Sequence, residues 1–378
     1  MKCKLSDICE YRKGKVNVSN LTLKTYISTE NMLPNKAGVV DANSLPSTAL
    51  VQEYKENDTL VSNIRPYFKK VWQAKHDGGC SNDVLVFQGK ANVDKDFLYY
   101  ILANDDFFAY SMATSKGTKM PRGDKKSIMQ YELQLFDIKV QKKIVSILKL
   151  LDKKIELNNA INNNLQEQME ALHRSWFIDY APFGDAKPSN WIKADIYSIA
   201  NIIYGAPFAS KLFNTEGLGN PIIRIRDLKE QTFVTYTTEI HPKGHLIQPG
   251  DIVVGMDGEF RPYIWGNSEA WLNQRVCIFE SKLPSDKAFM LYTIKPLLNV
   301  IEQTQVATTV IHIGKKDYDA FEIVLPDRKT LDQFGEITTP MLERIVNNSI
   351  ENKKLVQLRE ALLPQLMSGE LDVSKIKN

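Results

Sequence analysis

Two long stretches of this chain repeat apolar residues at alternating intervals of three and four, the spacing of helices that pack in a coiled coil. The second stretch begins 190 residues after the first. The first series is Ile144, Leu148, Leu151, Ile155, Asn158, Asn162, Leu165, Met169, Leu172 and Trp176, and the second is Phe334, Thr338, Met341, Ile345, Asn348, Asn352, Leu355, Arg359, Leu362 and Leu366. The pattern predicts two long helices built on one plan.

Both series carry asparagine at the same two central positions, although asparagine is a weak helix former. If the helices pack antiparallel, Asn158 falls near Asn352 and Asn162 near Asn348. A slip along the helices would then set amides against Leu or Ile and leave hydrogen bonds unmade. We predict that these four asparagines fix the register of the helix pair. A solvated, frayed stretch of helix is the alternative interpretation.

The similarity between the two halves extends upstream of the helices. The matched stretches are LSDI from Leu5 and YSIA near Ile196, NDTLVSNIRPY from Asn57 and GDIVVGMDGEFRPY from Gly250, CSNDVLVF ending at Phe87 and LNQRVCIF ending at Phe279, and FLYYI from Phe97 and FMLYT from Phe289. The second match aligns Arg65-Pro66-Tyr67 with Arg261-Pro262-Tyr263 across a three-residue insertion. The chain is therefore expected to contain two copies of one plan, a mixed globular unit followed by a long helix.

Short apolar runs bounded by Gly, Asn and Asp predict strands in each globular unit, and helix periodicity appears over residues 96–109 and 286–303. The predicted fold class is α+β. It has two similar globular α/β recognition domains separated by a pair of long antiparallel coiled-coil helices, an internal pseudo-two-fold repeat. The expected boundaries are residues 1–136 for the first domain, 137–178 for the first helix, 179–327 for a linker and the second domain, and 328–378 for the second helix and the tail.

The length of the helices has a consequence for what the two units can bind. Residues 144–176 correspond to roughly 48 Å of helix at ~1.5 Å per residue. A pair of such helices would hold two similar surfaces at a fixed separation. Because duplex DNA rises ~3.4 Å per base pair, this length suits two DNA sites centred about one helical turn apart or slightly more.

Composition narrows the class of protein but not its partner. The chain has 378 residues, 43% apolar and 25% charged, with a formal net charge of only +3, so a nucleic-acid surface must come from local clusters of Lys and Arg. Its four scattered cysteines form no C-x-x-C pair, which favours a reduced, cytoplasmic protein. No stretch approaches the ~18 apolar residues of a membrane span, so we expect no membrane partner.

Five stretches together carry a family resemblance that covers the whole chain. They are QKKIVSILKLLDKKIELNN from Gln141, LHRSWFIDYAPFG from Leu172, REALLPQLMSGEL from Arg359, and two polar loops, GTKM from Gly117 and ATTVIHIGKKD from Ala307. The layout resembles the specificity (S) subunit of type I restriction-modification systems. In that family each recognition domain is followed by a long helix, and a polar loop precedes each domain's last strand.

The resemblance implies a non-catalytic subunit that recognises a bipartite sequence in double-stranded DNA, one half-site per domain. It implies two adenine-methyltransferase (M) subunits packed on the long helices, and nuclease-translocase (R) subunits bound through the M subunits. The methyl donor and ATP would be bound by those partners, so we expect no cofactor and no metal on this chain.

Basic residues mix with aromatic and amide side chains at corresponding places in the two halves, as suits phosphate contacts and base-edge recognition. Arg65 and Arg261 are the strongest individual candidates because they occupy the matched Arg-Pro-Tyr positions. For any single residue, a solvated charge or a loop-supporting ion pair is the competing interpretation. The predicted DNA-binding residues are Arg65, Lys69, Lys70, Asn82, Lys116, Lys119 and Arg122 in the first half, and Arg224, Arg226, Arg261, Asn273, Gln274, Arg275, His312, Lys315 and Lys316 in the second.

Catalytic motifs are weak in this sequence. Pro326-Asp327 followed by Glu351-Asn352-Lys353 fits the loose pattern of restriction nucleases, but the second part lies inside the heptad helix. There is no G-x-x-x-x-G-K-[ST] or H-E-x-x-H motif. The alternatives to a DNA-recognition subunit are a coiled-coil adaptor that holds two protein-binding domains apart and a free-standing DNA nuclease or methyltransferase.

Overall fold

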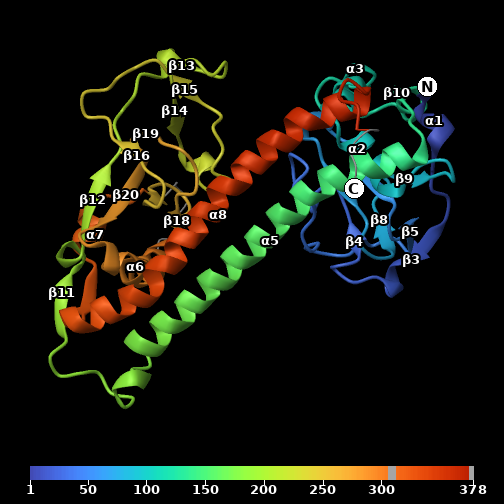
Figure 1. The fold of residues 1–378 in the computed structure, drawn as a ribbon. Helices are drawn as coiled ribbons and strands as arrows, with labels where there is room; N and C mark the ends of the chain where they lie inside the picture. Colours follow the sequence, from blue (N-terminus) through green and yellow to red (C-terminus); the bar gives the residue numbers. More distant parts are fainter. Residues whose placement is uncertain (305–311, 374–378) are drawn as a thin grey trace. The chain divides into compact units, whose positions relative to one another are not determined.

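The computed structural model describes residues 1–304 and 312–373 (Figure 1). The chain forms two compact units: unit 1 is Met1–Lys153 with Val356–Asn378, and unit 2 is Lys154–Leu355. Both boundaries fall inside long helices, α5 (Ile138–Phe177) and α8 (Arg328–Ser368), which cover the two heptad stretches. Of the polar loop ATTVIHIGKKD, residues 307–311 lie outside the described residues, as does the tail after residue 373.

Unit 1 contains two four-stranded sheets. The first has the order β2-β9-β6-β7, with every pair antiparallel, and the second has the order β3-β5-β8-β4, with only β4 and β8 parallel. A ribbon of β1 and β10 places the N-terminal strand beside the strand that leads into α5. The strands are β1 (Lys2–Lys4), β2 (Cys9–Tyr11), β3 (Lys15–Asn17), β4 (Tyr26–Ile27), β5 (Leu50–Tyr54), β6 (Thr59–Ser62), β7 (Val71–Gln73), β8 (Gly78–Cys80), β9 (Val84–Gly89) and β10 (Glu132–Gln134), and the short helices are α1 (Leu5–Ile8), α2 (Lys95–Ala103), α3 (Asp105–Ala113) and α4 (Lys125–Ile128).

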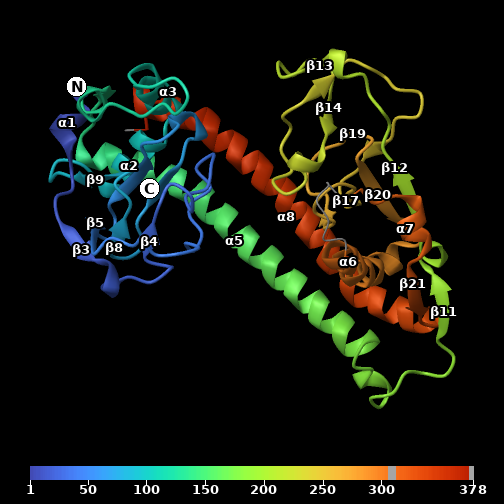
Figure 2. The ribbon, with the colours of Figure 1, turned by 180° about the vertical axis from the view of Figure 1, so that it is seen from behind.

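Unit 2 repeats this plan of two sheets, and its strands are seen from behind in Figure 2. Its first sheet has the order β12-β20-β17-β18, again antiparallel throughout, and its second is a larger sheet of order β13-β15-β14-β19-β16. The strands are β11 (Ile192–Asp195), β12 (Ala200–Tyr204), β13 (Phe213–Asn214), β14 (Asn220–Ile223), β15 (Tyr236–Thr237), β16 (Leu246–Ile247), β17 (Ile252–Gly255), β18 (Pro262–Ile264), β19 (Ala270–Leu272), β20 (Val276–Ser281) and β21 (Glu322–Leu325), and the shorter helices are α6 (Lys287–Thr304) and α7 (Lys315–Asp319).

The duplication read from the sequence extends to the register of the strands. In unit 1, Thr59 of β6 lies opposite Phe87 of β9, and in unit 2, Ile252 of β17 lies opposite Phe279 of β20. The β1-β10 ribbon of unit 1 has its counterpart in the β11-β21 ribbon of unit 2. The predicted internal repeat of two α/β units, each followed by a long helix, is confirmed.

A turn with a capping aspartate precedes an inner strand of the first sheet in both units, β6 in unit 1 and β17 in unit 2. The side chain of Asp58 accepts a hydrogen bond from Lys55 N at 2.8 Å, and that of Asp251 accepts one from Gln248 N at 2.7 Å. The residue before each aspartate, Asn57 or Gly250, has a left-handed backbone with φ of 71° or 92°. The same turn therefore begins the strand that positions the loops described below.

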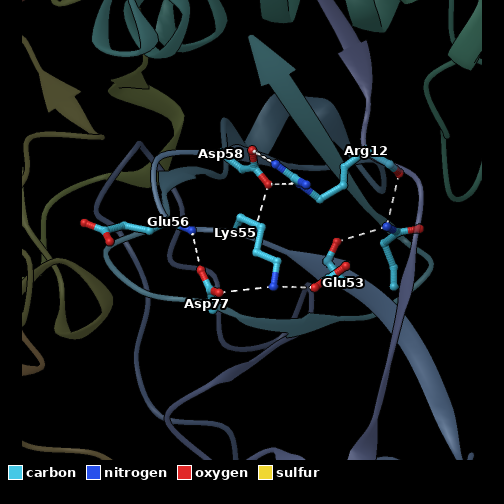
Figure 3. A network of polar contacts seen from close by, with 7 residues as sticks. Arg12, Glu53, Lys55, Glu56, Asp58 and Asp77 are labelled. Atoms are coloured by element: carbon cyan, nitrogen blue, oxygen red, sulfur yellow. Dashed lines mark hydrogen bonds and ion pairs between the residues drawn. The ribbon is translucent and has the colours of Figure 1, made fainter.

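In unit 1 this turn is further held by a polar network (Figure 3). The guanidinium of Arg12 binds both carboxylate oxygens of Asp58. Lys55 bridges Glu53 at 2.5 Å and Asp77 at 3.1 Å. A backbone hydrogen bond from Glu56 and the ammonium of Lys55 lower the pKa of Asp77. In unit 2, burial raises the pKa of Asp251.

One helix predicted in unit 1 differs from the structure. Helix periodicity over residues 96–109 predicted a single helix, whereas the chain forms α2 and α3 with a break at Asn104. Asn104 adopts an extended backbone, and its side chain accepts a hydrogen bond from Asp106 N, which caps α3. The apolar faces of both helices still reach one core, because Phe97 of α2 and Phe107 of α3 are both fully buried there.

Within unit 2, α5 and α8 pack antiparallel through the predicted asparagines. Asn158 Nδ2 donates to Asn352 Oδ1 at 2.9 Å, and Asn348 Nδ2 donates to Asn162 Oδ1 at 2.8 Å. Four residues forward along α5 thus correspond to four residues back along α8. All four side chains are at least nine-tenths buried. Each amide faces another amide, and the seam also leaves one buried acceptor, Asn158 Oδ1, without a hydrogen-bond partner among the described residues.

His173 of α5 lies in the aromatic core of unit 2. Its ring is 7% exposed and packs against Phe177, Phe289 and Tyr292, while Nε2 lies 3.2 Å from Thr293 Oγ1. Burial lowers the pKa of His173 to about 4. Trp191, near the start of the predicted segment 179–327, also contributes to this core, because it packs on Phe177.

We predict that His173 makes unit 2 less stable at mildly acidic pH. In the unfolded chain the imidazole takes up a proton as pH falls below ~6.5, whereas in the folded unit it stays neutral down to about 4. The free energy of unfolding should therefore fall by ~2 kcal/mol between pH 7.5 and pH 5. Urea denaturation at both pH values measures this loss, which should shrink in His173→Phe; an equal loss in the variant would contradict the assignment.

Candidate nucleic-acid interface

In unit 1, the loop after β6 is tied by main-chain hydrogen bonds to a short hairpin, residues 116–122. Arg65 N donates to Pro121 O at 2.8 Å, and Gly123 N donates to Asn63 O at 3.2 Å. Within the hairpin, Lys116 and Arg122 exchange two N–H···O bonds of 2.9 Å. This arrangement gathers predicted residues from two distant parts of the sequence, namely Arg65, Lys116, Lys119 and Arg122.

Two of the three basic side chains of this hairpin form ion pairs with carboxylates, which leaves the hairpin with a net positive charge. Lys116 Nζ lies 2.6 Å from Asp124 and lowers the pKa of that carboxyl, which also caps α4. Arg122 lies 3.3 Å from Asp83 and keeps more than half of its side chain exposed. Lys119 at the tip is exposed as well. The hairpin therefore presents an excess of positive charge to solvent.

The remaining candidates of unit 1 differ in how accessible they are. Asn82 is exposed beside Asp83. Lys69 contacts Asp105 at 2.7 Å but remains partly exposed. Lys70 donates to Thr29 O at 2.6 Å, and burial lowers its pKa, so its ammonium is used inside the unit.

The same main-chain frame recurs in unit 2. Met256 N donates to Arg275 O at 2.9 Å, just as Asn63 N donates to Asp83 O at 2.8 Å in unit 1. Asp257 pairs with His312 in an isolated antiparallel bridge, just as Ile64 pairs with Arg122. His312 thus corresponds in position to Arg122, and Arg275 corresponds to Asp83.

The side chains on this frame in unit 2 form a three-membered cluster. His312 Nδ1 lies 2.7 Å from Asp257 Oδ1, and Arg275 Nη1 lies 3.0 Å from His312 Nδ1 and 3.4 Å from Nε2. One nitrogen cannot both donate to the carboxylate and accept from the guanidinium. Donation from Nδ1 to Asp257 leaves Nε2 as the acceptor for Arg275. The cluster exposes about half of the His312 and Arg275 side chains.

The other candidates of unit 2 differ in their contacts and in their exposure to solvent. Arg226 donates to Thr235 Oγ1 at 3.0 Å, and Lys315 binds Asp319 at 2.8 Å and lies over the ring of Tyr197. Asn273 is buried, so its side chain is withdrawn from solvent. The candidates that remain exposed are Arg224, Arg226, Arg261, Gln274, Lys315 and Lys316.

The predicted match between Arg65-Pro66-Tyr67 and Arg261-Pro262-Tyr263 is wrong in structural terms. Pro262 pairs with Val254 in strand β18, and the residue in the same place in unit 1 is Val71 of β7, which pairs with Val61. Arg261 therefore corresponds to Lys70. Arg65 instead precedes a 3-10 turn, with φ of 49°. The shared letters are a coincidence of composition.

Sequence reasoning missed the carboxylates of this interface, Asp83 and Asp257. Each lies in one of the repeated stretches, but a carboxylate is not the side chain expected on a surface that binds an anion. Their role is local, because they orient Arg122 in unit 1 and His312 in unit 2.

Two features of residues 1–304 and 312–373 bear on other classes of function. This part of the chain holds no cluster of three or more His, Cys, Asp or Glu side chains able to bind a metal. Nor does any helix in it combine the length and apolar composition needed to cross a bilayer. Asp327 and Glu351 of the nuclease-like pattern are engaged in structural contacts, with Thr330 and Asn158 respectively.

Comparison with known proteins identifies one family. A family model described as "Type I restriction modification DNA specificity domain" matches residues 1–167 and again residues 188–360. Three similar proteins are type I restriction enzyme specificity subunits. The EcoBI subunit of Escherichia coli is 30% identical over 187 residues, which cover 48% of this chain and 40% of that protein.

Two further relatives are matched over more of their length. The HindI subunit of Haemophilus influenzae is 23% identical over 97% of this chain and 100% of its own, and the MjaIX subunit of Methanocaldococcus jannaschii is 23% identical over 76% and 71%. Among solved structures, the type I restriction-modification S subunit of M. genitalium superposes with a TM-score of 0.59, at 15% identity and 97% and 96% coverage. That likeness supports the two-unit fold.

Proposed function

The chain belongs to the type I restriction modification DNA specificity family, and we propose that it recognises a bipartite DNA sequence, one half-site with each globular unit. As in the relatives, the chain is the specificity subunit of a restriction-modification complex, and the catalytic activities lie in other subunits of that complex. We assign target recognition to residues 1–136 and 179–327, and spacing to the helices at 137–178 and 328–378.

The observation that carries this proposal is one main-chain frame with different side chains in its two copies. The frame is the pair of backbone connections around Asn63 in unit 1 and around Met256 in unit 2. On it, Arg122 beside Asp83 in one copy is replaced by His312 beside Arg275 in the other. Arginine, histidine and carboxylate present different donor and acceptor patterns to base edges. Two sites of one shape would therefore select two different base sequences.

The long helices supply a surface for the catalytic partners. Leu150, Leu157 and Ile161 of α5 and Leu358 of α8 are exposed, by 68%, 51%, 39% and 47% respectively. We propose that two methyltransferase subunits pack on these apolar side chains, and that nuclease-translocase subunits join through them. The methyl donor and ATP then belong to the partners. Four free cysteines fit a cytoplasmic site of action.

The competing functions lack comparable support. A free-standing nuclease would need Asp327 and Glu351 together, but Asp327 caps the start of α8 and Glu351 lies far along the same helix. An adaptor for two proteins would not need the exposed basic residues of both frames. Salt-sensitive DNA affinity of the assembled complex separates the adaptor from the DNA-recognition subunit.

The experiment that tests the function is co-expression of this chain with its cognate methyltransferase subunit, followed by genome-wide mapping of methylated adenine. The expected result is one bipartite motif with a fixed spacer, absent when the methyltransferase is expressed alone. The purified chain with DNA, Mg²⁺ and methyl donor should give neither cleavage nor methylation. Motif-independent methylation by the complex would contradict the proposal.

Exchange of the first recognition domain should change only one half-site. We predict that replacing residues 1–136 by those of another family member alters the first half of the methylated motif and preserves the second half and the spacer. Because α8 completes the core of unit 1, the donor should keep apolar residues opposite Leu363 and Leu366. A change in both half-sites would refute independent recognition.

Single substitutions on the two frames should act on different half-sites. Arg122→Ala should relax base preference in the first half-site by a discrimination of ~1–3 kcal/mol, and His312→Ala should do so in the second. Relative methylation rates on duplexes with single-base changes measure both effects, and each variant is the control for the other. Equal loss at both half-sites would indicate damage to folding or assembly instead.

The buried asparagines should set the spacer. We predict that helicity is retained when Asn158 and Asn352 are replaced together by Leu. The substitution removes Asn158 Oδ1, a buried acceptor that has no hydrogen-bond partner among the described residues. The loss of amide pairing allows other registers, which we expect to appear as altered spacer preference. A control with exposed Asn163 and Asn164 changed to Ala should keep the spacer. An unchanged spacer in the Leu variant would remove the register role.

A further inference from the structure

Left-handed backbone is concentrated around the basic segment 65–70 of unit 1. Of the eight non-glycine residues with positive φ in the described part of the chain, four lie here: Asn35 (55°), Lys36 (62°), Arg65 (49°) and Lys69 (51°). Such residues carry backbone strain and persist only when their surroundings hold them. Two main-chain bonds join the two segments, from Asn35 N to Phe68 O at 2.8 Å and from Lys36 N to Lys69 O at 2.9 Å.

The side chain of Lys36 is the buried centre of this arrangement. It is only 7% exposed, and its ammonium lies 2.9 Å from Asp105 of α3 and 2.7 Å from Glu360 of α8. Lys69 binds the second oxygen of Asp105 at 2.7 Å. Burial acts to raise the pKa of Asp105, but the two ammonium groups outweigh it and lower the pKa.

The network continues from Glu360 into the helix pair. Arg359 binds Glu360 at 2.9 Å and Asp152 of α5 at 2.7 Å, and the hydroxyl of Tyr100 donates to Asp152 at 2.6 Å. Three cations and three carboxylates are therefore linked in one chain of contacts. Because the other oxygen of Asp105 binds Lys36, a phosphate that draws Lys69 away leaves Asp105 still paired.

We propose that Lys36 is a positioning residue for DNA recognition: held by Glu360 and Asp105, it presents Lys69 and Arg65 to DNA and ties their segment to α8. The proposal rests on the proposed function, since it concerns how the DNA-binding segment of unit 1 is held. The ammonium of Lys36 is buried within unit 1, so its effect on DNA passes through the backbone pairing with Lys69 and through Asp105.

Unit 2 provides a matched control. Glu170 stands in α5 at the repeat position of Glu360 in α8, within the shared sequence Glu-Ala-Leu. It also binds a lysine, Lys295, at 2.7 Å, but both side chains are about half exposed. Lys295 lies over the ring of Tyr292 and belongs to α6, a helix that contains none of the predicted DNA-binding residues. Loss of this pair removes an ion pair without disturbing a DNA-binding segment.

The test uses the chain assembled with its methyltransferase subunits and a duplex carrying the motif found by methylation mapping. The variants are Lys36→Met, Glu360→Gln, Lys36→Arg and the control Glu170→Gln. We expect Lys36→Met to weaken binding of this duplex about tenfold and to lower discrimination at the first half-site only. Glu360→Gln should act in the same direction, Lys36→Arg should restore most of the loss, and Glu170→Gln should match the parent.

Two outcomes separate the proposal from its alternatives. If Lys36→Met and Glu360→Gln lower the thermal stability of the complex but leave half-site discrimination as in Glu170→Gln, the network only stabilises the fold and the proposal fails. Retained discrimination at the second half-site shows that a variant is folded and assembled. If the parent complex itself shows no sequence preference, the proposed function fails before the role of Lys36 is tested.

Discussion

A primary amide buried between two helices must find another polar group, and this requirement governs how α5 and α8 meet. Asn158 meets it with Asn352 and Glu351 of α8, and Asn162 meets it with Asn348, Ser349 and the carbonyl of Ile345. The next seam positions along both helices are apolar. The pairing is antiparallel, and the contact of Asp152 with Arg359 in unit 1 follows nearly the same register. A small loss in packing energy thus selects one alignment of two helices that apolar residues alone would leave free to slide.

Duplication gives each unit the same main-chain frame, and the frame leaves its side chains free to differ. The hydrogen bonds around Asn63 and Met256 involve only backbone atoms, so they persist whatever residue occupies the neighbouring positions. Arg122 and His312 can therefore change without loss of the fold. This separation of fold and surface allows the exposed side chains to change while the fold is preserved.

Much of the architecture was predictable from spacing, and much of the interface was not. Heptad positions and paired asparagines are periodic signals, so the helices and their partners followed from the sequence. The Arg-Pro-Tyr match failed because identical residues do not report strand register. The register shows that Arg261 of unit 2 is equivalent to Lys70 of unit 1. Lys36 was not predictable, because it belongs to no motif and its partner Glu360 is 324 residues away in the sequence. The break at Asn104 was missed because a capping side chain interrupts a helix without changing its apolar period.

The composition of the unit 1 core bears on the order in which the protein can fold during synthesis. Leu363, Leu366, Met367 and Val373 are buried against helices formed from residues before 150. Unit 2, in contrast, is complete by Leu355. Unit 1 is translated first, but its core is completed last. Its apolar surface therefore stays exposed in the nascent chain until the final turns of α8 are synthesised. A nascent chain of this design depends on protection from aggregation for most of its synthesis, and a premature stop after unit 2 would leave the older half open.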